Sequence, residues 1–279
     1  MKTTLAASIA LLAAMAGVVR PLAKADYVPV PQSTPFTPAC TLPFEAIKQH
    51  HPIDDACDSS GEGGPNAKLQ NAMKNNFCSS GAPRTVTVAG FRQIQAQSGG
   101  FAAGCPSCPA ADRSIYNVTV PSLGSAWKEG DLVRLVGWVI DAHISNGDSG
   151  GENVNCNHNG ESWNDLHIAV AQSKSEDDLC NAVVVEMSPH FRPAAWMEIT
   201  HFGKTRPMRF TGSLLFDANH GACEGAVRSK PPRLSSWEIH PIYKAEVCKH
   251  KSIAGCSAAN DSLWMPFDEW VGSEEDGGQ

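Results

Sequence analysis

The sequence has few of the features that would place a protein in a membrane or on a nucleic acid. After residue 25, no apolar run is long enough to cross a bilayer. Basic residues are scarce, with 22 Lys and Arg against 29 Asp and Glu. Tight binding of nucleic acid or an anionic membrane needs clustered Lys and Arg. The composition therefore disfavours such binding over the whole chain and leaves only a local basic groove open.

Signature motifs of several protein classes are also missing. The chain contains no His-Glu-x-x-His sequence of zinc proteases and no Gly-x-Ser-x-Gly turn of serine hydrolases. Residues 145–164 are rich in Gly, Asn and Asp, but their spacing does not match a calcium-binding loop. The chain has no internal repeat. No reaction class follows from a motif.

The N-terminus has the pattern of a cleavable signal peptide. Lys2 precedes an apolar run at residues 5–19, and Ala23-Lys24-Ala25 is a small-x-small cleavage signal. The alternative is an uncleaved anchor, but the run of ~15 residues is short of the ~20 that span a bilayer. We therefore expect cleavage after Ala25 and a secreted or periplasmic location. Cleavage removes three of the 22 basic residues and none of the 29 acidic ones, so the mature net charge is near −10.

The chain has ten cysteines, none of them in the predicted signal peptide. In an oxidising compartment this even number predicts up to five disulfides, whose connectivity the sequence leaves open. Cys105-Pro-Ser-Cys108 has the spacing of a redox motif or half a zinc site. No second pair of ligands follows nearby, and Gly and Pro surround the motif where a thioredoxin-type site would open a helix. A structural disulfide or loop clip is the favoured interpretation, and we expect Cys156 to fasten the loop around it.

The first part of the mature chain divides into a tether and a small region with cysteines. Residues 26–39 are rich in Pro and predict an extended tether. Residues 40–112 predict a Cys-bearing α/β region with a helix at 67–77, for which Asn66 is a possible N-cap. The apolar residues that this helix places near one face are Leu69, Ala72, Met73 and Phe77.

Residues 113–250 have the pattern of a β-barrel. Alternating apolar residues predict strands at 132–144, 165–171, 182–187, 208–216 and 236–247. A short helix is expected at 189–202, between the third and fourth strands, and Gly137 and Gly212 indicate a bulge or bend. The fold class is therefore mainly β, a five-stranded OB-like Greek-key barrel with a short helix between strands 3 and 4. Residues 251–279 are expected to form a C-terminal tail with an apolar patch at 263–271.

Parts of this region also resemble a known group of proteins. The segment Glu129-Gly130-Asp131-Leu132-Val133-Arg134-Leu135-Val136-Gly137-Trp138-Val139 resembles the first strand of many OB domains. Asp165-Leu166-His167-Ile168, Val183-Val184-Val185-Glu186 and Trp237-Glu238-Ile239-His240-Pro241-Ile242 look like segments of uncharacterised secreted bacterial proteins with an OB-like core. The resemblance covers residues 125–250, just under half of the mature chain. It implies the fold and no activity.

Polar residues recur on one face of the predicted strands. Pairing strands two and three about a turn near 176–177 places His167 opposite Glu186. In the predicted barrel, Asp165, His167, Glu186, Glu238 and His240 then gather on one surface. Asp165, His167, Glu186 and His240 are types of side chain that hold a divalent metal. His167, Glu186, Glu238 and His240 are candidates for acid–base catalysis. The alternative is a polar outer face with simple cross-strand pairs.

The loop between strands one and two is a candidate ligand groove, because OB-folds bind ligands there. The ligand-binding candidates are Trp163, Asp165, His167 and His240. Trp163 at the loop edge would supply a stacking surface for a base or sugar. Residues 190–233 are the most basic part of the chain, interrupted by Asp217 and Glu224. They indicate a mixed solvated surface more than a nucleic-acid patch.

These observations favour a binding protein over an enzyme. We expect a secreted OB-fold module for an extracellular ligand, an oligosaccharide or an oligonucleotide. The first alternative is a metal-dependent or acid–base hydrolase, phosphodiesterase-like, that uses the His and Glu cluster, with a divalent metal as its cofactor. The second alternative is a structural or partner-binding envelope protein.

Overall fold

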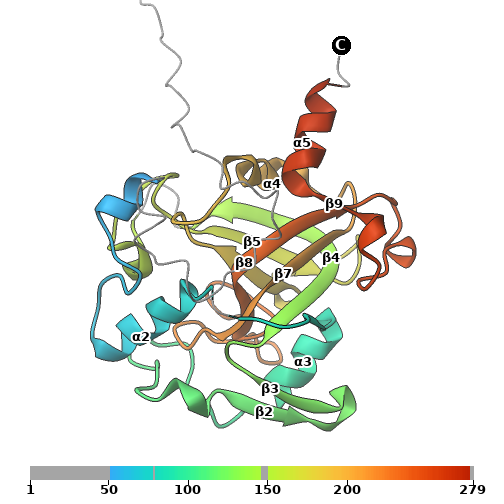
Figure 1. Cartoon of the computed structure of the whole chain (residues 1–279). Helices are drawn as coiled ribbons and strands as arrows, with labels where there is room; N and C mark the ends of the chain where they lie inside the picture. The colour runs from blue at the N-terminus through green and yellow to red at the C-terminus, as the bar shows by residue number, and fades with distance from the viewer. Residues whose placement is uncertain (1–50, 78, 146–149, 277–279) are drawn as a thin grey trace, which may run out of the picture.

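A computed structural model describes residues 51–77, 79–145 and 150–276 of the chain. The predicted signal peptide, the Pro-rich tether, Cys40 and Cys78 lie outside these ranges. The described chain is mainly β, with a central barrel and short helices around it (Figure 1). None of its helices combines the length and the apolar character that crossing a bilayer requires.

Five strands close the barrel. They are β4 (Leu132–Ile144), β5 (Leu166–Ala171), β6 (Val183–Met187), β7 (Met208–Phe216) and β8 (Trp237–Cys248). Their order is β4-β5-β6-β8-β7, and β7 returns to β4. The β6–β8 contact is parallel, at Val185 and Ile239, and the other contacts around the barrel are antiparallel. The predicted positions of all five strands are confirmed to within one residue at each end.

Strand β4 closes the barrel because it pairs with two different partners. Its first half, up to Gly137, pairs with β7, and its second half, from Trp138, pairs with β5. At the change of partner the chain passes so close to β5 that a Cβ on Gly137 would lie 2.6 Å from the Ala171 carbonyl oxygen. The register shift itself comes slightly later, between Val139 and Asp141. The bend expected at Gly137 is therefore a close approach beside a bulge.

The inside of the barrel is apolar, as the period-two pattern of the strands predicts. Leu166, Ile168 and Val170 of β5 belong to the same hydrophobic core as Val183 and Val185 of β6. The region before the barrel shares this core through Phe91 and Ile94 of α3 (Val88–Ala96), and Phe77 also belongs to it.

Helix α2 (Pro65–Lys74) differs from the prediction. It begins at Pro65 with Gly64 as its N-cap, so Asn66 lies in the first turn. Its buried residues are Gln70, Asn71 and Lys74, whereas Leu69 is 45% exposed. The residues that α2 buries are thus polar and differ from the apolar residues that the sequence places near one face. The reason is tertiary, because α2 covers a set of buried ions on the barrel and needs polar partners for them.

Elements at the edge of the barrel were not all foreseen. β1 (Arg84–Thr85) pairs parallel with β4, and β2 (Asn117–Val120) forms a hairpin with β3 (Ser125–Lys128), below the barrel in Figure 1. The expected helix at 189–202 is a 3₁₀ helix at Ala194–Glu198 that continues into α4 (Ile199–Phe202). After residue 250, β9 (Trp264–Pro266) pairs with β8, and α5 (Phe267–Asp276) follows. The apolar patch expected there packs on the barrel, with Phe267 fully buried.

We predict that Gly212→Ala destabilises the protein by about 3 kcal/mol, at the upper end of what overpacking costs. Gly212 lies at a register shift between β7 and β8, as its sequence position indicated. A Cβ there would lie 2.3 Å from the Pro241 carbonyl oxygen and 2.6 Å from Ile239 Cγ2. Urea denaturation monitored by tryptophan fluorescence measures the loss. Gly99→Ala is the matched control, since its Cβ meets no atom within 4 Å, and a similar loss in both variants would contradict the prediction.

Candidate functional site

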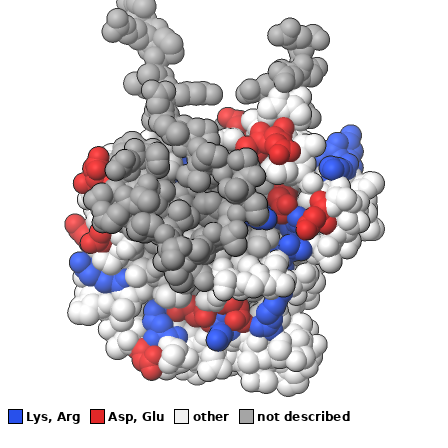
Figure 2. Space-filling model, in the orientation of Figure 1, with Lys and Arg blue, Asp and Glu red and all other residues white. Residues whose placement is uncertain are grey.

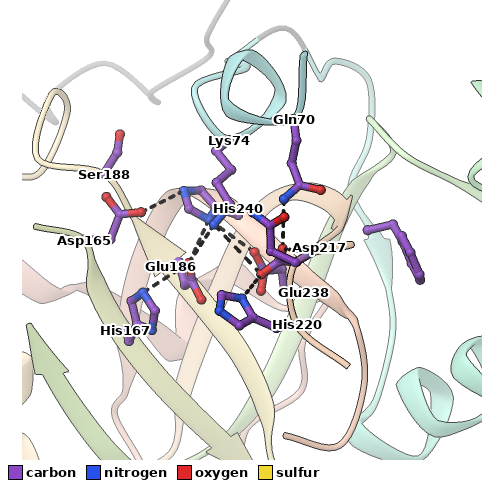
Figure 3. Close-up of polar contacts among 12 residues, drawn as sticks. Gln70, Lys74, Asp165, His167, Glu186, Ser188, Asp217, His220, Glu238 and His240 are labelled. Carbon is purple, nitrogen blue, oxygen red and sulfur yellow. Dashed lines mark hydrogen bonds and ion pairs between the residues drawn. The ribbon is translucent and has the colours of Figure 1, made fainter. Parts of the chain in front are cut away.

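A set of buried ionisable side chains covers the outer face of β5, β6 and β8. We call this set the ion cluster. Its members are Lys74, Glu152, Asp165, His167, Glu186, Asp217, His220, Arg233, Glu238 and His240. They come from α2, the loop before β5, three strands and the β7–β8 loop, and Figure 3 shows most of them converging. Burial of so many ionisable groups is rare unless they are paired.

The strand register brings the five residues singled out in the sequence together. His167 of β5 lies directly opposite Glu186 of β6, as predicted, with 3.4 Å between His167 Nε2 and Glu186 Oε2. On β8, His240 Nδ1 lies 3.0 Å from Glu186 Oε2 and 3.3 Å from Glu238 Oε1. His240 Nε2 lies 3.7 Å from Asp165 Oδ2. The cluster is therefore more than a solvated strand face, because Asp165, Glu186, Glu238 and His240 are all fully buried.

Two cations bridge these carboxylates. Lys74, the last residue of α2, places Nζ 3.8 Å from Glu186 Oε2 and 3.9 Å from Asp217 Oδ2. The Arg233 guanidinium donates to Glu238 Oε2 at 2.8 Å and to Asp217 Oδ2 at 3.3 Å. Neither cation was predicted as part of the site. Sequence spacing carries no signal for them, because α2 and the β7–β8 loop reach the barrel face only in the folded chain.

Asp217 and His220 form a second unpredicted pair. Asp217 follows β7, and its Oδ2 lies 2.6 Å from His220 Nδ1. Gln70 of α2 donates to the other oxygen of Asp217 at 3.0 Å. The only sequence signal was the alternation that put Asp217 on the polar face of the fourth strand together with Thr211 and Ser213. That alternation identified a polar face and gave no reason to expect His220 at the same place.

The loop at 150–164 contributes Glu152 and Asn155. Glu152 Oε1 lies 3.5 Å from His167 Nε2, and Glu152 Oε2 accepts from the backbone N–H of Asp165 at 2.9 Å. Asn155 donates to Asp165 Oδ1 at 2.8 Å. A disulfide between Cys57 and Cys156 fastens this loop, which confirms the role expected for Cys156. The loop was correctly singled out, but Glu152 within it was not.

Three further disulfides join described cysteines. They are Cys105–Cys108, Cys180–Cys223 and Cys248–Cys256. The first confirms that the Cys-Pro-Ser-Cys segment is a disulfide-bonded loop clip. No cysteine in the described ranges is free.

A pocket of about 480 Å³ opens above the cluster. The cluster members that line it are Lys74, Glu152, His167, His220 and Arg233, and Asp141 and His143 line it as well. The other five cluster residues lie behind this lining and do not reach the pocket. The pocket-facing layer is thus mostly basic, and the layer behind it is mostly acidic.

Trp163 does not line this pocket. Its ring packs against His158, with 4.6 Å between the ring centroids. No Trp, Tyr or Phe is among the described residues of the pocket wall. A stacked base or sugar therefore has no aromatic platform inside the described part of the pocket.

The seven Lys and Arg residues at 190–233 are divided between the interior and the surface. Arg192, Arg209 and Arg233 are buried, and Arg209 pairs with Glu246 at 2.6 Å. On the surface, Arg228 pairs with Asp178 at 2.8 Å. Figure 2 shows blue and red side chains interspersed on the visible face, with no extended area of one sign. This distribution agrees with the mixed surface that the sequence favoured.

Burial and mutual attraction shift the pKa values in the cluster. Burial lowers the pKa of His167 and His240, but Glu186 and the other carboxylates outweigh it and raise both to about 9. Burial also opposes the charge of Glu186, but His167 and Lys74 bring its pKa well below the usual range. Burial and Glu152 raise the pKa of Asp165 to about 6, whereas His167 brings that of Glu152 to about 2. The neighbouring carboxyl groups of Glu152 and Asp165 thus have clearly different pKa values.

No protein-family model matches the sequence, and no curated protein is significantly similar to it.

We predict that Lys74→Met lowers the free energy of unfolding by about 3–5 kcal/mol at pH 7, because it leaves buried carboxylates without their cation. Without Lys74, the pKa values of Glu186 and Asp217 rise. The difference in free energy of unfolding between wild type and Lys74→Met should therefore become smaller as the pH falls towards about 4, where these carboxylates lose their charge in the variant. Urea denaturation at several pH values tests both points.

Lys68→Met is the matched control for this change, because Lys68 is on the same helix and exposed. Its effect should stay within about 0.5 kcal/mol. A deficit for Lys74→Met that is equally small, or that widens in acid, would contradict the interpretation.

Proposed function

We propose that this protein is a secreted OB-fold binding module whose pocket takes a small extracellular ligand with an anionic group, such as an acidic saccharide or a nucleotide. The observation that carries the proposal is the basic lining of the pocket, backed by buried carboxylates, on the face of β5 and β6. OB-folds bind their ligands on the face of the second and third strands, between the loops that follow the first and fourth strands.

The OB assignment is supported by the connectivity of the barrel. Numbered along the chain, its strands follow the order 1-2-3-5-4 and return to 1, with α4 between the third and fourth. The loop after β4 supplies Glu152, and the loop after β7 supplies His220 and Arg233. Both loops therefore occupy the positions that the binding loops of an OB-fold have.

The chemistry of the pocket favours charge recognition over stacking. Arg233 Nε and Nη2 are buried and have no hydrogen-bond partner among the described residues. Arg233 lines the pocket beside His220, whose side chain is 31% exposed. A carboxylate, sulfate or phosphate supplies the acceptors that the N–H groups of a guanidinium and an imidazole need. A volume of about 480 Å³ suits a ligand of one or two rings.

Export is supported by two independent features. The N-terminal 25 residues have the signal-peptide pattern, and eight described cysteines are joined in four disulfides. Disulfides on this scale persist in oxidising compartments. We propose that the protein meets its ligand outside the cytoplasm.

We predict that uronic-acid disaccharides or mononucleotides bind the protein, whereas neutral disaccharides do not. His220→Ala should weaken that binding about tenfold, the effect of losing one charge-assisted hydrogen bond. Trp163→Ala is the matched control and should leave the affinity unchanged. Isothermal titration calorimetry measures all three proteins. Selective binding of neutral sugars, or an affinity that depends on Trp163 and not on His220, would overturn the proposal.

Hydrolysis at the same pocket is a second candidate function. The specific observation that favours it is His167, which lines the pocket between Glu152 and Glu186. Glu152 Oε1 lies 3.5 Å from His167 Nε2, so a carboxylate and an imidazole that can exchange a proton both line the pocket.

For this candidate we predict slow hydrolysis of bis(p-nitrophenyl) phosphate, with kcat reduced about 100-fold in His167→Ala because the general acid–base group is lost. His143→Ala changes the same residue type at the pocket edge and should leave kcat unchanged. Release of p-nitrophenol measures both variants. Equal activity in wild type and His167→Ala would remove hydrolysis by this residue from consideration.

A further inference from the structure

The innermost part of the ion cluster contains polar atoms whose hydrogen-bonding capacity is unused. Asp165 Oδ2, His240 Nε2 and both carboxylate oxygens of Glu186 are buried and form no hydrogen bond of acceptable geometry with described residues. The three side chains are at most 1% exposed. A buried polar atom without a partner costs about 1–3 kcal/mol. Three neighbouring residues carry this desolvation cost. Their polar atoms therefore point to a bound ligand that would satisfy them.

The spacing of these atoms suits a metal ion. Asp165, Glu186 and His240 each offer one ligand atom, and these atoms lie within 4.8 Å of one another. His240 Nε2 and Asp165 Oδ2 are 3.7 Å apart, which is too long for a hydrogen bond. Two ligands at about 2.0–2.1 Å from a tetrahedral zinc ion are separated by about 3.3 Å. A shift of a few tenths of an ångström brings these two atoms to that distance.

The neighbours of these residues orient them as ligands. His240 Nδ1 lies 3.0 Å from Glu186 Oε2 and 3.3 Å from Glu238 Oε1, so carboxylates can hold an Nδ1–H. In the neutral ring that metal binding requires, Nε2 then keeps its lone pair and faces Asp165. Arg233 donates to the other oxygen of Glu238 at 2.8 Å. Asn155 donates to Asp165 Oδ1 at 2.8 Å and leaves Oδ2 open. In metal sites, a carboxylate commonly accepts a hydrogen bond from the second nitrogen of a histidine ligand. Ligating carboxylates are commonly hydrogen-bonded as well.

The charge of the cluster also leaves room for a cation. Five carboxylates, those of Glu152, Asp165, Glu186, Asp217 and Glu238, face only two permanent cations, Lys74 and Arg233. Metal ligation requires a neutral imidazole, and with the histidines neutral three negative charges remain to be balanced. A divalent ion balances two of them in a place where uncompensated charge is expensive.

We propose that Asp165, Glu186 and His240 bind one divalent transition-metal ion. His167 belongs to a second metal-capable group, with Glu152 and Asp165, on the pocket side. An imidazole beside two carboxylates favours zinc or a similar ion over magnesium and calcium, which prefer oxygen ligands alone. The inference goes beyond the proposed function, because the ion needs no other ligand in the pocket.

The test is metal binding by the full-length mature protein, stripped with a chelator and titrated with Zn²⁺ in the absence of any organic ligand. Calorimetry should give one equivalent. Asp165→Asn and His240→Gln should each weaken binding about 100-fold or more, beyond the usual effect of an outer neighbour. His143→Ala is the matched control and should change affinity less than about threefold, a small effect on the free-energy scale. The His143 ring centroid lies only 5.7 Å from that of His167, but His143 belongs to neither metal-capable group.

Co²⁺ provides a readout on wild type that does not depend on how well the variants fold. One equivalent of Co²⁺ should produce visible d–d absorption of a nitrogen- and oxygen-coordinated ion, and Zn²⁺ should abolish it. Absence of this spectrum, full binding by folded Asp165→Asn and His240→Gln, or loss of binding in His143→Ala would overturn the metal site. Failure here leaves the saccharide and nucleotide titrations to be decided separately, because those titrations also run on chelator-treated protein.

Discussion

The pairing of two buried cations with five carboxylates is the interaction on which the rest of this face depends. Lys74 joins α2 to Glu186 on β6 and to Asp217 after β7. Arg233 joins the β7–β8 loop to Asp217 and Glu238. Each ion is buried only because its partners are buried, so loss of one leaves the others uncompensated. The ion pairs therefore tie α2 and the β7–β8 loop to this face of the barrel.

The two sides of the same strands consequently have different physical roles. Leu166, Ile168 and Val185 face the barrel interior and contribute to a continuous apolar core. His167 and Glu186, their immediate neighbours in sequence, face outward into the ion cluster. The apolar side supplies the stability that an internal polar network does not provide by itself. The barrel can therefore carry a costly site on one face without losing its fold.

The order of the layers above the barrel explains the range of chemistry that this face supports. Basic side chains line the pocket, and the acidic side chains behind them supply their charge partners. Asp165, Glu186 and His240 lie deepest and keep ligand atoms free. An anionic ligand in the pocket and a cation at the buried carboxylates are compatible with each other. The ligand would be opposite in charge to the basic lining, and the cation would be opposite in charge to the carboxylates. Recognition by charge also agrees with the position of Trp163 outside the pocket wall.

Local patterning in the sequence determined the barrel strands and the facing pair His167 and Glu186, because alternation and turn position are short-range properties of a strand. It also indicated that Asp165, Glu238 and His240 share that face. Only the tertiary structure decided that this face is buried and that Lys74, Glu152, His220 and Arg233 complete it. The hydrogen bond from Gln70 to Asp217 spans 147 positions, and no local signal encodes such a contact. Helix α2 shows the limit of prediction from local sequence. Its apolar pattern does not reveal that its polar residues are buried, because their partners are the carboxylates of the barrel.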